Sequence, residues 1–140
     1  MNNGIILGID FSADYTQVSI LCDDNTPETQ KMIEKAEEFL MPTTMFYNTD
    51  LSEWAVGFEA YNRSRVEGGV FIDKVSLRMK ESIGLIVDGK SVKWKEIAMV
   101  FFSKVIEQVI GGWGKINIYN IVVSVDDPDE IIMQSLYSAF

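Results

Sequence analysis

The sequence contains no histidine and a single cysteine among its 140 residues. Without histidine, neither a Ser-His-Asp nor a Cys-His catalytic site can form, and zinc has no imidazole ligand. One cysteine can form neither an internal disulfide nor a thiolate cage for a metal. Cys22 ends a run of alternating apolar residues, so we interpret it as a small core residue rather than a nucleophile.

Positive charge is also scarce, because 12 Lys and Arg residues stand against 21 Asp and Glu, giving a formal net charge of −9. A phosphate backbone or an anionic membrane would be repelled on average, which argues against nucleic acid and membranes as partners. The sequence does not open on a basic segment followed by an apolar one, and no apolar run reaches membrane-spanning length. We therefore predict a cytoplasmic protein.

The composition is otherwise that of a folded globular protein, with 47% hydrophobic and 24% charged residues. A chain of this length predicts a single domain, residues 1–140. Its last predicted helix has barely begun at Phe140, so we expect the domain to be a fragment of a longer protein.

The opening of the chain carries the clearest pattern. Ile5 to Ile9 is a near-continuous apolar run, which favours a strand covered on both faces, and Asp10 follows directly. Val18, Ile20 and Cys22 then alternate with mostly polar residues, as in a strand with one inner face. Together they predict an antiparallel hairpin with a carboxylate at its tip.

The rest of the chain predicts an α/β fold in which short strands alternate with helices. Asp88-Gly89 between two apolar runs is typical of a type I′ hairpin turn, and residues 95–110 carry the apolar stripe of a helix. Residues 29–33 favour a strand, although apolar spacing in 32–40 also fits a short helix. The other predicted elements are strands at 43–47 and 54–57, a helix at 58–65, mixed loop and helix at 70–80, a buried strand at 121–125 and a helix starting at 126–129.

Residues 8–15, which read G-I-D-F-S-A-D-Y, resemble the first phosphate loop of the actin-like ATPase superfamily. They are most similar to the G-I-D-L-G-T-T-Y opening of DnaK-type seventy-kilodalton heat-shock chaperones. This resemblance implies a ribonuclease-H-like α/β fold, a mixed sheet with flanking helices, forming the first lobe of a nucleotide-binding domain. Further segments resemble chaperone counterparts in the same order, at residues 42–47, 54–60, 70–74, 95–100 and 120–125.

The resemblance also implies a nucleotide site at the hairpin loop, with ATP and Mg²⁺ as cofactors. Its phosphate-binding residues would be Asp10, Ser12, Ala13, Asp14 and Tyr15. Asp10 would act on Mg²⁺ through a bound water, because a carboxylate cannot favourably contact a polyphosphate directly. The second lobe, which this sequence does not contain, is the partner that would complete the cleft.

The loop nevertheless departs from the chaperone pattern at three positions. Ser12 stands where the family has glycine, and Ala13 and Asp14 stand where it has threonines. Asp14 adds negative charge where the β- and γ-phosphates should lie, and the missing glycine restricts the backbone. Both changes predict weak nucleotide binding.

Two further positions depart from the family. At the place of its catalytic lysine this chain has Tyr61, with Arg63 and Arg65 close behind, and arginine is not an equivalent replacement. The turn after the strand at 121–125 reads Asp126-Asp127-Pro128 rather than proline and alanine. We interpret these acids as favouring a helix N-terminus.

Simpler roles remain open for the loop carboxylates. Asp10 could cap a turn, Asp14 could form one, and the pair could hold a divalent ion weakly. For the parent protein we expect a chaperone-like nucleotide-binding domain with weak or absent ATP binding and hydrolysis, and no catalysis by this fragment. The alternative is a non-enzymatic scaffold or protein-interaction module that keeps the fold without the site. A sugar or acyl-phosphate kinase of the same superfamily is disfavoured by the chaperone-like order of the segments.

Overall fold

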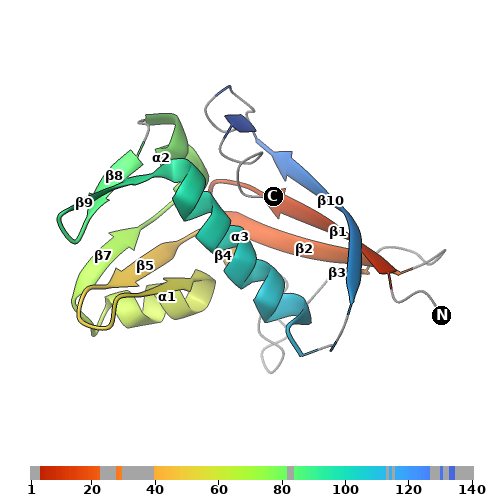
Figure 1. The fold of residues 1–140 in the computed structure, drawn as a ribbon, viewed down its shortest axis with the longest axis horizontal. Coiled ribbons are helices and arrows are strands. Elements are labelled where there is room, and N and C mark those ends of the chain that lie inside the picture. Colours follow the sequence, from red (N-terminus) through yellow and green to blue (C-terminus); the bar gives the residue numbers. More distant parts are fainter. Residues whose placement is uncertain are drawn as a thin grey trace.

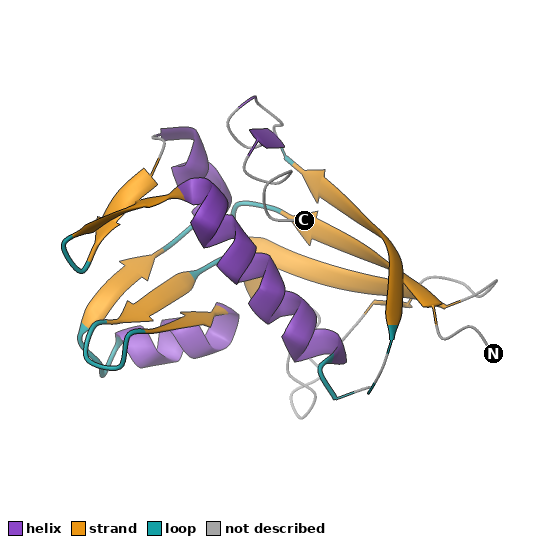
Figure 2. Cartoon of the chain, viewed as in Figure 1, coloured by secondary structure: helices purple, strands orange, loops and turns teal. Residues whose placement is uncertain are grey.

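The computed structural model describes residues 4–22, 28–29, 40–81, 84–112, 114, 116–126, 130 and 133–134. Their mixed α/β architecture, drawn in Figures 1 and 2, confirms the predicted class. The elements in chain order are β1 (Gly4–Phe11), β2 (Tyr15–Cys22), β3 (Glu28–Thr29), β4 (Met41–Pro42), β5 (Met45–Asn48), β6 (Glu53–Val56), α1 (Gly57–Ser64), β7 (Gly69–Ile72), α2 (Val75–Glu81), β8 (Gly84–Val87), β9 (Lys90–Lys93), α3 (Trp94–Ile110) and β10 (Asn117–Val125).

The largest sheet has the strand order β10-β1-β2-β3, and β4 also pairs with β2. β1 and β2 form the predicted antiparallel hairpin, with Asp10 opposite Gln17. β10 runs parallel to β1 on the other side and places Ser124 opposite Asp10. The sheet is therefore mixed, and the carboxyl ends of β1 and β10 lie at the same edge (Figure 1).

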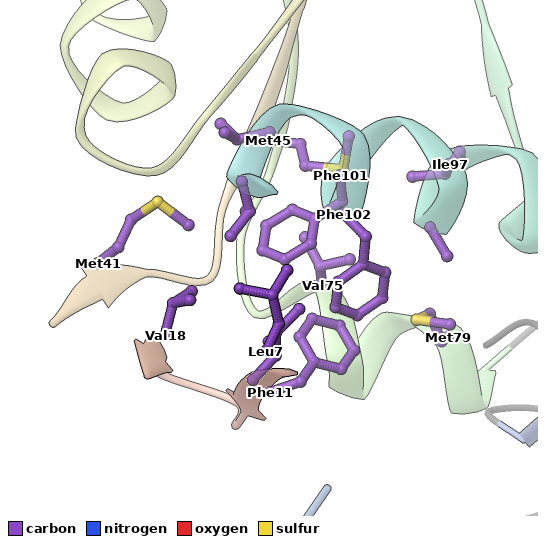
Figure 3. Packing of buried hydrophobic residues seen from close by; sticks show 14 of the residues in the cluster. Leu7, Phe11, Val18, Met41, Met45, Val75, Met79, Ile97, Phe101 and Phe102 are labelled. Carbon is purple, nitrogen blue, oxygen red and sulfur yellow. The ribbon is translucent and has the colours of Figure 1, made fainter. Parts of the chain in front are cut away.

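The core forms where α3 packs against one face of this sheet. Every second residue of β1 from Ile5 to Phe11 is buried, together with the inward side of α3. The Phe11 ring centroid lies 5.4 Å from that of Phe101 and 5.0 Å from that of Phe102. Figure 3 shows these three rings together in the core. Because Phe11 directly precedes the hairpin loop, this packing fixes the base of the loop.

A second sheet, β6-β5-β7, confirms the strands predicted near residues 43–47 and 54–57 and is antiparallel throughout. The chain passes from β6 into α1 at Gly57, whose φ of +64° favours glycine. A Cβ at this position would lie 2.3 Å from the Met41 Cγ atom. The N–H of Gly57 donates to the Thr44 carbonyl over 3.0 Å, so the backbone of this junction is fixed.

The β8–β9 hairpin confirms the predicted type I′ turn, because φ is 53° at Asp88 and 74° at Gly89. Leu85 and Val92 on its inner face pack against the main core, and Val87 on the same face is buried. Ile86 points outward and is 71% exposed. No other strand among the described residues pairs with this hairpin.

The structure differs from three sequence predictions. The strand at 121–125 is not buried, because Val122 is 56% exposed and β10 has only β1 beside it within the described residues. Residues 70–80 are not mixed loop and helix but contain β7, paired with β5, and the regular helix α2. β1 is not covered equally on both faces, since Ile6 and Gly8 are only half-buried.

Other predictions are confirmed or lie outside the described residues. α3 confirms the helix predicted at 95–110, and the Glu96 side chain accepts the Lys93 N–H over 3.0 Å at its start. Most of the segment 29–40 and residues 127–129 are not described, so the elements predicted there are not assessed. In the part of the chain that is described, no helix is both long and apolar enough to cross a membrane.

Candidate functional site

The residues expected at the site lie at the edge where β1 and β10 end. This placement follows from the parallel pairing of the two strands, which brings Ser124 opposite Asp10 although 114 residues separate them. In α/β sheets, ligands commonly bind just beyond the carboxyl ends of parallel strands. The loop 12–14 and the start of α2 border the same edge, as their hydrogen bonds show.

Asp10 is exposed and accepts two hydroxyl hydrogen bonds at one oxygen. The Ser12 and Ser124 hydroxyls each donate to Oδ1 over 3.0 Å. These bonds hold the carboxylate at the hairpin tip and join the end of β1 to the end of β10. Asp10 thus stands where the sequence predicted it, and Ser124 is a partner that the sequence analysis did not identify.

The backbone of the loop is bonded to oxygen atoms of the protein itself. The N–H of Ala13 donates to Oδ2 of Asp126 over 3.0 Å, and the N–H of Ser12 donates to the Tyr15 carbonyl over 3.1 Å. An N–H group that already donates to a carboxylate is engaged by an anion of the protein itself. The Asp126 carboxylate, interpreted from sequence as favouring a helix N-terminus, thus bonds to the loop.

The Asp14 side chain is exposed, and its carboxylate forms an ion pair with the ammonium group of Lys74. This hydrogen bond and the charge of Asp14 raise the pKa of Lys74 above its ordinary value. Lys74 directly precedes α2 and has a left-handed backbone conformation, with a φ of 50°. The only ammonium group described beside the loop is thus already paired.

Thr43 ties the loop to α2 through its backbone and its side chain. Its N–H donates to the Asp14 carbonyl and its own carbonyl accepts the Val75 N–H, each over 3.1 Å. The hydroxyls of Thr43 and Thr16, both fully buried, lie 2.8 Å apart. This chain of bonds explains why Lys74, just before Val75, reaches Asp14.

The remaining predicted residues contribute differently. Tyr15 is 50% exposed and pairs with Pro42 across β2 and β4. Tyr61 packs on Phe71, with the Arg65 guanidinium 5.6 Å from its ring centroid. Neither side chain has a described contact with the loop.

Arg63 is occupied by three carboxylates. It lies 2.9 Å from Glu67, 3.4 Å from Glu59 and 3.6 Å from Glu53. The Glu67 hydrogen bond and these charges raise the pKa of Arg63, while Asn48 and Arg63 lower the pKa of Glu67. Arg63 therefore joins α1 to its neighbouring strand, and it cannot be assigned the charge role of the family's lysine.

The described loop does not fit direct binding of Mg²⁺ and a polyphosphate. Three carboxylates lie around it, those of Asp10, Asp14 and Asp126. The Ala13 N–H donates to Asp126, and Lys74 pairs with Asp14. A phosphate would have to displace these carboxylates against their repulsion. Within the described residues, no three His, Cys, Asp or Glu side chains are grouped to hold a metal ion.

Sequence reasoning found the loop but not the residues that close it. Lys74, Thr43 and Ser124 lie in segments that resemble chaperone counterparts, but no local pattern gives them a role at the loop. Their proximity arises from strand pairing and from the backbone bonds of Thr43. A polar residue at the carboxyl end of an apolar strand was the one available signal for Ser124.

Comparison with known proteins gives a family without an assigned activity. Residues 26–140 match the family described as "Family of unknown function (DUF5716) C-terminal". The matched range contains Lys74, Ser124 and Asp126, and it begins after the loop. No curated protein matches the chain. Since the match covers most of its length, this chain belongs to the family of unknown function DUF5716, C-terminal.

Proposed function

We propose that the chain is a diverged, ribonuclease-H-like domain of the actin-like ATPase type that binds ATP weakly or not at all. We propose further that it works as a non-enzymatic protein-interaction module. The mixed sheet β10-β1-β2-β3 and the position of Asp10 at the end of β1 support the proposed origin. The loss of nucleotide binding is supported by the replacement of the chaperone loop's glycine and two threonines with Ser12, Ala13 and Asp14.

One observation carries this proposal: the loop is closed by carboxylates of the same chain. Asp126 accepts the Ala13 N–H, and Asp14 pairs with Lys74. An internal carboxylate competes at a high effective concentration with any phosphate from solution. Nucleotide binding would also bring further negative charge beside Asp10.

Isothermal titration with Mg-ATP tests the proposal, in this chain and in the longer protein that we expect to contain it. Wild type should give no saturable heat at millimolar nucleotide, and Asp10→Asn should behave in the same way. Wild-type binding with a Kd below about 1 mM, or roughly −4 kcal/mol, that Asp10→Asn abolishes would establish a working nucleotide site and refute the proposal.

A double variant tests the closed loop itself. Asp14→Asn with Asp126→Asn removes both internal anions and should give saturable heat at millimolar Mg-ATP, where wild type gives none. Asp50→Asn with Asp88→Asn removes the same charge at two exposed positions outside the loop and should leave the affinity unchanged. Equal affinities in both double variants would show that the carboxylates do not close the loop.

A further inference from the structure

The charge of the chain is unevenly distributed along its sequence. Residues 74–95 contain six of the 12 basic residues and only two of the 21 acidic ones. Their formal charge is therefore positive in a chain whose net charge is −9. These residues span α2, the β8–β9 hairpin and the start of α3, which follow one another along the chain (Figure 1).

The basic residues of this region divide into paired and unpaired groups. Lys74 pairs with Asp14, and Arg78 pairs with Glu81 over 3.3 Å. Lys90, Lys93 and Lys95 are exposed, and none of them takes part in an ion pair among the described residues. Three cations within six residues thus face solvent.

Apolar surface accompanies these lysines. Ile86 lies opposite Ser91 on the outward face of the hairpin and is 71% exposed. Lys93 is two residues from Ser91 on the same strand, so it shares that face. Lys90 lies opposite Val87 and therefore shares the other face of the hairpin with it, beside the turn. We define the hairpin surface as Ile86, Ser91 and Lys93 on the outward face, together with the exposed Lys90 and Lys95 next to them in sequence.

The hairpin also offers backbone edges. It forms a sheet of two strands with which no other described strand pairs, so an extended segment can add to it. Its turn is fixed by the left-handed residues Asp88 and Gly89, and its inner face is held by the buried Val87. The surface is therefore preorganised.

We propose that the hairpin surface docks an extended acidic segment of a protein partner. Carboxylates of that segment pair with Lys90, Lys93 and Lys95, an apolar side chain covers Ile86, and its backbone extends the two-stranded sheet. A nucleic-acid backbone has no strand to add to this edge, and the net charge of −9 opposes a long polyanion. This inference rests on the proposed interaction role and names its surface and class of partner.

Fluorescence anisotropy with a labelled peptide of Glu-Glu-Val repeats measures the docking, because this order places both Glu and Val on each face of an added strand; the Lys-Val peptide has Lys in place of every Glu. We expect saturable binding by the 140-residue chain that weakens as salt is added, and no binding of the matching Lys-Val peptide. Lys90→Glu with Lys93→Glu should weaken binding by at least about tenfold, because two attractions become repulsions. Ile86→Ser should weaken it by about fivefold through lost apolar contact.

Matched variants exclude an effect of net charge or of folding. Arg65→Glu with Lys104→Glu makes the same change of charge outside the hairpin surface and should alter binding by less than about twofold. Val66→Ser replaces a side chain that is 84% exposed on another surface and serves as the control for Ile86→Ser. Circular dichroism and thermal unfolding of each variant confirm that the fold is kept.

Several results would overturn the docking proposal. These are absence of saturable binding, equal binding of the Lys-Val peptide, equal loss in the two charge-reversal variants, and unchanged binding by Lys90→Glu with Lys93→Glu. Tighter binding of an oligothymidine, lost in that same variant, would assign the surface to nucleic acid instead. The Mg-ATP titration reports on the loop, so peptide docking beside tight ATP binding would refute the proposed function alone.

Discussion

Two hairpins of this protein differ in the charged groups around their turns, although each turn contains an aspartate, Asp14 in the first and Asp88 in the second. The loop between β1 and β2 carries Asp14, and its N–H, carboxylate and carbonyl groups bond to Asp126, Lys74 and Thr43. The turn between β8 and β9 is followed by Lys90 and Lys93, which have no ion pair among the described residues. The first loop is the part that resembles a ligand site.

The difference shows that the segment resembling a known ligand site, the β1–β2 loop, need not be the surface that is free to bind a partner. A loop whose polar groups are already bonded offers little free energy to a ligand, because each new bond replaces an existing one. Exposed charges beside an exposed apolar side chain lose no internal partner when a ligand binds. We therefore assign the structural role to the β1–β2 loop and the recognition role to the β8–β9 hairpin.

The largest effect is expected where the loop meets the core. Phe11→Ala should lower the free energy of unfolding by about 3–5 kcal/mol, because it removes a fully buried ring between Phe101 and Phe102. Urea unfolding measures the loss. Phe71→Ala, at a ring that is 38% exposed, should cost much less. Equal losses would show that the loop is not fixed by the core.

The second effect concerns the link between the loop and α2. Thr43→Val should destabilise the fold by about 1–3 kcal/mol, because the buried Thr16 hydroxyl then loses its partner. The matched control is Thr49→Val, since the Thr49 hydroxyl is at 3.5 Å from its carbonyl partner in an exposed setting. Chemical denaturation of both variants compares them, and a Thr43→Val cost no larger than that of Thr49→Val would contradict the role of Thr43.

The third prediction acts on the other hairpin. Gly89→Ala should cost about 1–2 kcal/mol, because the φ of 74° is unfavourable for a residue with a Cβ. The same substitution at Gly68, where a Cβ meets no atom within 4 Å and φ is not positive, should be nearly neutral. Thermal unfolding distinguishes them. A neutral Gly89→Ala would mean that the turn is not held in its left-handed form.

The smallest effect compares a lysine of each hairpin. The pKa of Lys74 is raised in the fold, so its ion pair stabilises the protein fully below the ordinary lysine pKa and is lost as pH rises through the folded value. The free energy of unfolding of the wild type should fall between about pH 9.5 and 12 as this ion pair is lost, and Lys74→Gln should show a smaller fall. Lys90→Gln, which removes a lysine without a described ion pair, is the control. Identical slopes in the two variants would remove the distinction between the hairpins.

Much of the fold follows from local sequence patterns. Apolar alternation predicted β1 and β2, Asp88-Gly89 predicted the second hairpin, and the apolar stripe predicted α3. These signals work because each element is stabilised by its own periodicity and turn chemistry. The ribonuclease-H-like assignment and the nucleotide origin of the loop remain predictions.

What sequence could not supply is the long-range pairing. Asp126 reaches Ala13 across 113 residues because β10 pairs in parallel with β1, and no local pattern encodes that register. An apolar run such as 121–125 does not reveal whether a second neighbour covers the strand. β7 was missed for a related reason, since its pairing with β5 defines it more than its own sequence does.

The amide resonance of Ala13 tests the closed loop most directly. In a two-dimensional ¹⁵N NMR titration with Mg-ATP, this resonance should stay in place at millimolar nucleotide and shift on Asp126→Asn, which replaces the carboxylate acceptor. A saturable shift of the Ala13 resonance in wild type, with a Kd below about 1 mM, or roughly −4 kcal/mol, would show that the loop opens to phosphate and would contradict the account.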